Sequence, residues 1–281
     1  MENNDRYNTL RNSNNNLQQE SYFHNFIKSQ LLITNHRYRG LKPGCEAIIK
    51  PEDFFKRTIE EDKPVSHLLD VSCFDLSVLN LGLNSMLTEM SKEGWLQDVT
   101  PEQLATDINV ALPELLKNIL IENISDLQNQ SNDLGISLGF LSMIGGFLTQ
   151  PALRLLGDSI PKMLLDAWEH TPCPICGRMP SVVIKPESAP WVFKCSFCRT
   201  EYKMDIFACP NCKIEGSESK EFHLVGENQE YEIAECKECG RYYKIINTAR
   251  LKDQIPEGLE DSFTRLLDNI AANKNLVRLD E

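Results

Sequence analysis

The sequence predicts an α+β fold: an all-helical N-terminal domain, two four-cysteine units built on β-hairpins, and a closing helix. Before residue 171, apolar residues recur at intervals of three and four, as on one face of a helix. From Thr171 the composition changes, because eight cysteines and several short β-prone runs follow within 80 residues. These observations divide the chain into a polar tail (1–20), a helical domain (21–170), two cysteine units (171–206 and 207–250) and a C-terminal helical segment (251–281).

The clearest helix of the N-terminal domain is predicted to begin after Thr100. Thr100 is a favoured N-cap, Pro101 suits the first turn, and Gln103 completes a capping box. Further helices are expected over about 134–148 and 151–169. A membrane span needs roughly 20 predominantly apolar residues, and the stretch Leu134–Leu153 is too rich in glycine and polar residues to form one. The predicted apolar face of the helix after Thr100 comprises Leu104, Ile108, Leu112, Leu115, Leu116, Ile119, Leu120 and Ile124.

The closing helix is predicted over about residues 257–272. Its apolar residues again recur at helical intervals, so they should share one side of the helix. These residues are Leu259, Phe263, Leu266, Leu267 and Ile270.

Composition and charge narrow the classes of function. Apolar residues make up 41% of the 281 residues, which is sufficient for a packed core. The net charge of -12 repels phosphate backbones, so nucleic acid is not expected as a partner. The N-terminal residues lack the apolar segment of a signal peptide, and the ten cysteines are therefore expected to remain thiols in a reducing compartment. The expected location is cytoplasmic.

The eight clustered cysteines form four C-x2-C pairs. Two intervening residues allow a tight turn, here called a knuckle, to direct both sulfurs at one ion, and two knuckles supply four thiolates for a tetrahedral site. The first two pairs are separated by 18 residues and the last two by 23, a gap that a β-hairpin fills in zinc sites. The predicted metal ligands are Cys173, Cys176, Cys195, Cys198, Cys209, Cys212, Cys236 and Cys239.

An internal repeat favours sequential pairing of the knuckles. Residues 173–176 (CPIC) match residues 209–212 (CPNC), and a tyrosine-lysine pair, Tyr202-Lys203 or Tyr243-Lys244, follows the second and the fourth knuckle at the same offset. The first four cysteines would then hold one ion and the last four a second. Interleaved pairing, in which the first knuckle joins the third and the second joins the fourth, stays open on the sequence alone.

The identity and role of the metal also stay open. Four-thiolate tetrahedra accept iron as well as zinc, and a closed site is compatible with a purely structural role, whereas iron would allow redox function. A dithiol oxidoreductase would explain one cysteine pair but not four with matched spacing. The sequence has no G-x-S-x-G, phosphate-binding loop or dinucleotide fingerprint, so we do not expect an enzyme.

The knuckles are accompanied by further residues at fixed positions. A tryptophan precedes the first knuckle, and short polar or aromatic runs follow the others. These residues are Trp168, Gly177, Met179, Pro180, Ser196, Phe197, Thr200, Glu201, Lys237, Glu238, Gly240, Tyr243, Lys244 and Ile245. With them, the run from Trp168 to Ile246 resembles the formate dehydrogenase accessory protein family, FdhE.

The resemblance implies a helical domain followed by two rubredoxin-like, or zinc-ribbon, units, and an assembly factor with no catalytic activity. Such a protein would act in the cytoplasm on the catalytic subunit of a formate dehydrogenase and would carry iron at its four-cysteine sites. Members often have tryptophan where this chain has Tyr202, and they have a basic, leucine-rich opening that this chain lacks.

Two other functions stay open. A zinc-ribbon protein that binds nucleic acid or the transcription machinery is one, although eleven Lys and Arg are balanced by eleven Asp and Glu between Thr171 and Arg250. A rubredoxin-like electron carrier is the other, and it would require iron in place of zinc.

Overall fold

The computed structural model describes residues 40–42, 45, 54–92, 94, 96, 100–203, 205, 208–255 and 259–280. The predicted tail, residues 1–20, lies outside these ranges. The chain divides into two compact units, of which the helical unit comprises Met1–Cys45 and Asp70–Ala152, and the cysteine unit comprises Glu46–Leu69 and Leu153–Glu281.

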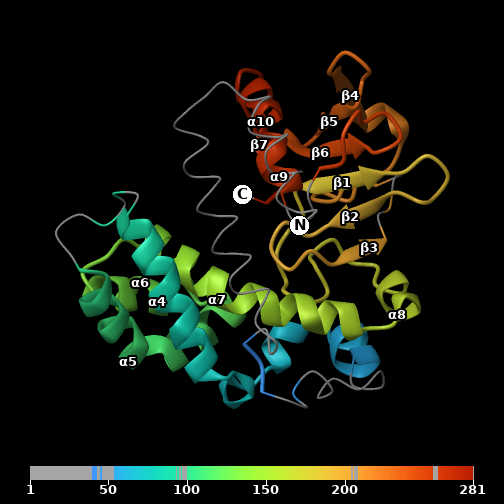
Figure 1. The fold of residues 1–281 in the computed structure, drawn as a ribbon. Helices are drawn as coiled ribbons and strands as arrows, with labels where there is room; N and C mark the ends of the chain where they lie inside the picture. Colours follow the sequence, from blue (N-terminus) through green and yellow to red (C-terminus); the bar gives the residue numbers. More distant parts are fainter. Residues whose placement is uncertain are drawn as a thin grey trace. The chain divides into compact units, whose positions relative to one another are not determined.

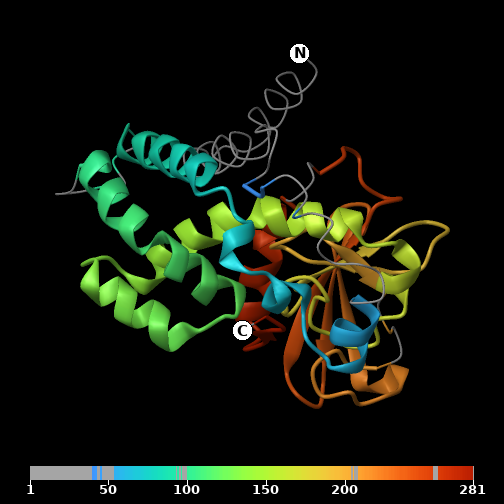
Figure 2. The same ribbon diagram turned by 90° about the horizontal axis from the view of Figure 1, so that it is seen from below.

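Helices α4, α5 and α6 pack side by side in the helical unit (Figure 2). Their packing buries the apolar face that the sequence predicts on α5, and Thr100 caps this helix by accepting a 3.3 Å hydrogen bond from the backbone N–H of Gln103. Ile124 was also predicted on that face, but it is 59% exposed because α5 ends at Leu120 and Ile124 begins the next helix. The elements are a short 3-10 turn, η4 (Val71–Cys73), α4 (Leu76–Lys92), α5 (Pro101–Leu120) and α6 (Ile124–Asp133).

Helix α7 (Leu138–Ser159) runs through Pro151, where the sequence predicts a break between two helices. Proline removes one backbone donor, yet the apolar residues on both sides of it, Leu148 and Ala152, are completely buried, and this packing outweighs the lost hydrogen bond. The separate helix α8 (Lys162–Asp166) follows.

Within the described part of the chain, no helix taken alone has both the length and the apolar character needed to cross a membrane. The bent pair α6 and α7, with 110° between them, passes the same test of length and composition.

The cysteine unit is built on one sheet of seven strands, in the order β3-β2-β1-β6-β5-β4, with β7 paired to β6 (Figure 1). The two predicted hairpins are β1–β2 and β4–β5, and β3 and β6 are the strands that carry the tyrosine-lysine pairs. The bounds are β1 (Val182–Lys185), β2 (Val192–Lys194), β3 (Glu201–Lys203), β4 (Lys220–Val225), β5 (Tyr231–Cys236), β6 (Arg241–Asn247) and β7 (Val277–Arg278).

A parallel pair, β1 and β6, joins the two hairpin units into this single sheet. Val183 lies opposite Ile245, and both side chains are completely buried. Further structure comes from Glu46–Leu69, where a π-helical turn, η2 (Phe54–Glu60), precedes a 3-10 turn, η3 (Val65–Leu68). Another 3-10 turn, η5 (Ser217–Ser219), precedes β4.

The predicted closing helix consists of two short helices, α9 (Glu260–Phe263) and α10 (Arg265–Ala272), and the strand β7 follows them. Helix α10 covers one face of the sheet (Figures 1 and 2), where Leu267 and Ala271 pack against Ile233 and Tyr242. Leu266, which the sequence places on the apolar side, is 64% exposed. The break at Thr264, whose hydroxyl donates to the carbonyl of Glu260 at 2.8 Å, shifts the buried face of the helix.

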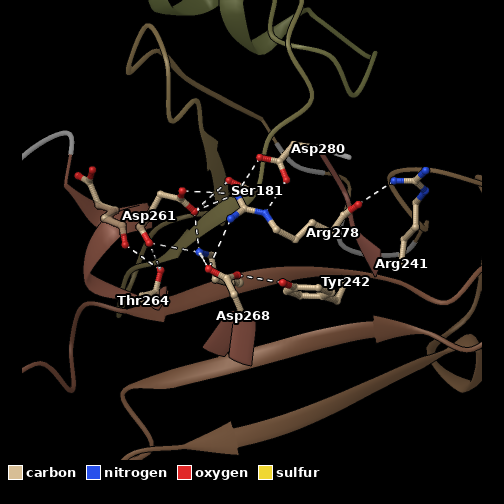
Figure 3. A network of polar contacts seen from close by, with 10 residues as sticks. Ser181, Arg241, Tyr242, Asp261, Thr264, Asp268, Arg278 and Asp280 are labelled. Carbon is tan, nitrogen blue, oxygen red and sulfur yellow. Dashed lines mark hydrogen bonds and ion pairs between the residues drawn. The ribbon is translucent and has the colours of Figure 1, made fainter. Parts of the chain in front are cut away.

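A network of charged side chains attaches this C-terminal segment to β6 (Figure 3). Lys244 is completely buried, and its Nζ lies 2.6 Å from Asp261 and 3.0 Å from Asp268. Arg278 of β7 contacts the same two carboxylates and also Asp280, at 2.8 Å. Burial raises the pKa of Asp261, but Lys244 and Arg278 outweigh this effect, so that the pKa is lowered overall.

Candidate metal centres

All four knuckles have the same backbone geometry. The residue after the second cysteine has a positive φ in each case, between 60° and 77°, and its N–H donates to the carbonyl of the first cysteine at 2.8–3.0 Å. Glycine adopts this left-handed conformation without strain, as Gly177 and Gly240 do, whereas Arg199 and Lys213 adopt it in the other two knuckles. The four short turns are thus folded alike, and each directs two sulfurs to the same side.

The first four predicted ligands lie together in a completely covered group. Its members are at most 3% exposed, and their sulfurs all lie within 4.8 Å of one another. The two sulfur pairs that join the knuckles, Cys173 to Cys198 and Cys176 to Cys195, are each 3.4 Å apart. We call this group site 1; its members are Cys173, Cys176, Cys195 and Cys198.

The last four predicted ligands form a second group, which is partly open to solvent. Cys209 and Cys236 are buried, Cys239 is half-buried, and Cys212 is exposed. The sulfurs of Cys209 and Cys239 are 3.8 Å apart, and those of Cys212 and Cys236 are 3.7 Å apart. We call this group site 2; its members are Cys209, Cys212, Cys236 and Cys239. The grouping is therefore sequential, as the internal repeat indicated.

Both groups fit a tetrahedral metal ion. A Zn–S bond of about 2.3 Å places the sulfurs of a tetrahedron about 3.8 Å apart, close to the distances in site 2 and slightly longer than those in site 1. A disulfide would require about 2.0 Å, and all ten cysteines are free thiols. Four sulfur donors suit zinc and iron alike.

Burial of the thiols opposes their charged thiolate form, so metal binding is coupled to the loss of protons. Burial raises the pKa of the Cys173 and Cys176 thiols well above the usual range, and that of Cys209 to about 12. Such thiols keep their protons at neutral pH unless a metal replaces those protons, and metal binding must therefore release protons.

Thr171 connects the two sites, a role that the sequence did not reveal. Its carbonyl accepts a 2.7 Å hydrogen bond from Tyr202, which follows the second knuckle, and its hydroxyl donates to the carbonyl of Pro210 in the third knuckle. The same hydroxyl accepts from Lys213. One residue before the first knuckle thus fixes elements of both sites.

Lys220 is a second residue that sequence reasoning missed. It lies opposite Cys236 in the β4–β5 register, it is buried, and its Nζ donates to the carbonyl of Ala208 at 2.8 Å. Burial lowers the pKa of Lys220, while the sulfurs of Cys209 and Cys236 act in the opposite direction. With a divalent ion in this group of four cysteines, a cation here would offset part of the surplus negative charge of the four thiolates. Only the register of the β4–β5 hairpin, which pairs Lys220 with Cys236, identifies this lysine as a neighbour of the cysteines.

Two further groups lie outside both sites. His223 on β4 contacts Glu235 at 2.9 Å and Glu221 at 3.8 Å, an arrangement that the scattered histidines of the sequence did not suggest. In the helical unit, Cys73 is buried and its thiol is hydrogen-bonded to that of Cys45. Burial is the main cause, and the contact with Cys45 the second cause, of a pKa of Cys73 raised to about 11.

No family model matches the sequence. The protein FdhE homolog of Aquifex aeolicus (strain VF5) is 28% identical over 171 residues, which are 59% of this chain and 60% of the relative. The FdhE homologs of Enterobacter sp. (strain 638) and Proteus mirabilis (strain HI4320) are 30% and 29% identical over 98 residues. These matches cover 34% of this chain and 31% of each relative, so the similarity spans well under two thirds of their lengths.

The crystal structure of the FdhE protein from Pseudomonas aeruginosa resembles this chain with a TM-score of 0.56, covering 90% of this chain and 83% of the other. The identity is 20%, so this likeness concerns the fold alone. It agrees with the predicted order of a helical region followed by a sheet that bears two four-cysteine groups. The resemblance that the cysteine units predicted is thus confirmed as similarity in sequence to three FdhE homologs and in fold to one FdhE protein.

Proposed function

We propose that this protein is a cytoplasmic accessory factor that binds the catalytic subunit of a formate dehydrogenase and promotes its assembly without being an enzyme itself. It holds two metal ions, one in site 1 and one in site 2, and iron is the metal that we propose for the cell. Neither nucleic acid nor a membrane is part of this proposal.

The observation that carries the proposal is the pair of four-thiol groups on a sheet of this topology, in a chain similar to FdhE homologs. Four thiolates form a closed coordination sphere, so neither ion has a vacant position at which a substrate would bind. A rigid support for protein contacts, or a centre that changes its oxidation state, is what such a site can provide. The resemblance of the cysteine units to the formate dehydrogenase accessory protein family is the reason for proposing formate dehydrogenase as the system in which this is used.

A pull-down with the formate dehydrogenase catalytic subunit of the same organism tests the partner. The metal-loaded protein is expected to retain the subunit. Cys173→Ser removes one ligand of the buried site 1 and is expected to abolish retention, whereas Cys45→Ser, outside both sites, is expected to preserve it. Failure of the metal-loaded, folded wild-type chain to retain the subunit would refute the proposed partner.

A further inference from the structure

The two metal sites differ most in how they are covered. All four cysteines of site 1 are buried, whereas site 2 has one exposed member, Cys212, and one half-buried member, Cys239. The difference is sharpest between equivalent positions of the repeat: Cys176, the second cysteine of the first knuckle, is 3% exposed, and its counterpart Cys212 is exposed.

A separate stretch of chain covers the first knuckle. The backbone N–H groups of Val65 and Ser66 donate to the carbonyls of Pro174 and Ile175 at 2.9 and 2.7 Å. A Cβ placed on Gly177 would lie 3.0 Å from Pro64, which shows how closely this stretch approaches the knuckle. Ile175, whose carbonyl accepts one of these hydrogen bonds, is completely buried.

The third knuckle presents a different surface. Asn211 occupies the position of Ile175, and residues 211–216 are all exposed. The substitution of an amide for an aliphatic side chain matches this exposure, because an isoleucine here would leave apolar surface in water.

The remaining knuckle of each site shows the same contrast. In site 1 the guanidinium of Arg178 lies 3.5 Å from the centre of the Phe197 ring, and this contact joins the two knuckles across the site. The equivalent residues beside site 2 are Ile214 and Glu238, and both are exposed.

We propose that site 2 exchanges its metal with ligands from solution, with Cys212 as the first ligand to be displaced, while site 1 retains its metal as a structural centre. This inference rests on the metal binding proposed above, but not on the proposed partner. In the exchange step a donor atom of the incoming ligand binds the metal, the bond from the metal to Cys212 Sγ breaks, and the released sulfur takes a proton from water. The oxidation state of the metal does not change.

Site 1 is expected to exchange more slowly, because its first knuckle must lose the two hydrogen bonds to Val65 and Ser66 before a ligand can enter. Two such bonds correspond to a difference of roughly thirtyfold in rate, or about 2 kcal/mol.

The test uses the full-length chain loaded with zinc, whose content is first measured by elemental analysis. Excess 4-(2-pyridylazo)resorcinol then removes the zinc, and the absorbance of the complex gives the rate. Release of the two ions in two phases of equal size, differing roughly thirtyfold in rate, is the expected result. A short pulse of N-ethylmaleimide after the fast phase, followed by peptide mass spectrometry, should label the cysteines of site 2 and leave those of site 1 unmodified.

The outcomes separate the two proposals. A chain that binds no zinc refutes the metal sites themselves, and with them this inference. A chain that binds two zinc ions and releases both at one rate, or that is labelled first at Cys173, Cys176, Cys195 or Cys198, refutes the exchange proposal alone.

Discussion

The hydroxyl of Tyr202 donates a 2.7 Å hydrogen bond to the backbone carbonyl of Thr171. Both residues are buried, and Thr171 in turn donates to Pro210 of the third knuckle. Through this contact, the strand that follows site 1 is tied to the knuckle that begins site 2. The two halves of the internal repeat therefore form one structure in which neither site is positioned independently.

Tyr202→Phe is expected to destabilise the cysteine unit by about 1–3 kcal/mol, because it leaves the buried carbonyl of Thr171 without its tyrosine donor. Denaturant unfolding of the metal-loaded protein measures the change in the free energy of unfolding. Tyr231→Phe, at a half-buried position on β5, is the matched control and should have a smaller effect. Equal effects of the two changes would show that the contact to Thr171 has no special weight.

Gly157→Ala is expected to destabilise the protein by about 1–3 kcal/mol through overpacking. A Cβ at this position in α7 would collide with the Oγ1 of Thr200 and lie 3.5 Å from Ile175. Thr200 cannot easily move, because it is buried and its Oγ1 lies 3.2 Å from the sulfur of Cys198.

Gly139→Ala provides the control in the same helix, since a Cβ there would meet nothing within 4 Å. This change should be neutral or stabilise the protein by about 0.5 kcal/mol at most, because alanine favours the helix more than glycine does but Gly139 lies in the first turn. Thermal unfolding measures the change in stability of both variants. A stabilising effect of Gly157→Ala would contradict the close approach of α7 to Thr200.

Lys244→Met is expected to cost about 3–5 kcal/mol, because it leaves Asp261 and Asp268 without the buried cation that contacts both of them. The repeat supplies the control: Lys203 occupies the equivalent position after the second knuckle and is exposed, so Lys203→Met should change the free energy of unfolding by about 0.5 kcal/mol at most. Similar costs for the two lysines in urea unfolding would rule out a stabilising role for the network of Figure 3.

Phe197→Ala is expected to accelerate the slow phase of zinc release, because it removes the ring on which Arg178 lies across site 1. Glu238→Ala changes the equivalent, exposed position beside site 2 and should leave the slow phase unchanged. The release assay with 4-(2-pyridylazo)resorcinol measures both variants. An unchanged slow phase in Phe197→Ala would mean that the Arg178–Phe197 contact does not limit access to site 1.

The grouping of the cysteines was accessible from the sequence because knuckles are local structures. Two residues between cysteines determine each turn, and the repeat of C-P-x-C and of tyrosine-lysine indicated which knuckles belong together. The left-handed residue after each knuckle is a structural finding: Gly177 and Gly240 suit that conformation, whereas Arg199 and Lys213 give no sequence signal of it.

The contacts between distant segments were not accessible. The residues of β1 and β6 do not predict that Val183 lies opposite Ile245 in a parallel pair, because the two residues are 62 positions apart in the sequence. The same holds for Pro64 and its neighbours, which lie over the first knuckle from more than 100 positions away. The strand β7 was missed because two residues are too short to show a β pattern.

The eight cysteines are proposed to hold two metal ions, each with four sulfur ligands. Elemental analysis of protein purified under anaerobic conditions gives the number of ions per chain. X-ray absorption spectroscopy at the edge of that metal identifies the atoms that bind it. Two ions per chain with only sulfur in the first coordination sphere is the result that we predict. A metal-free chain, or a single ion with nitrogen or oxygen among its ligands, would rule out the two four-sulfur sites.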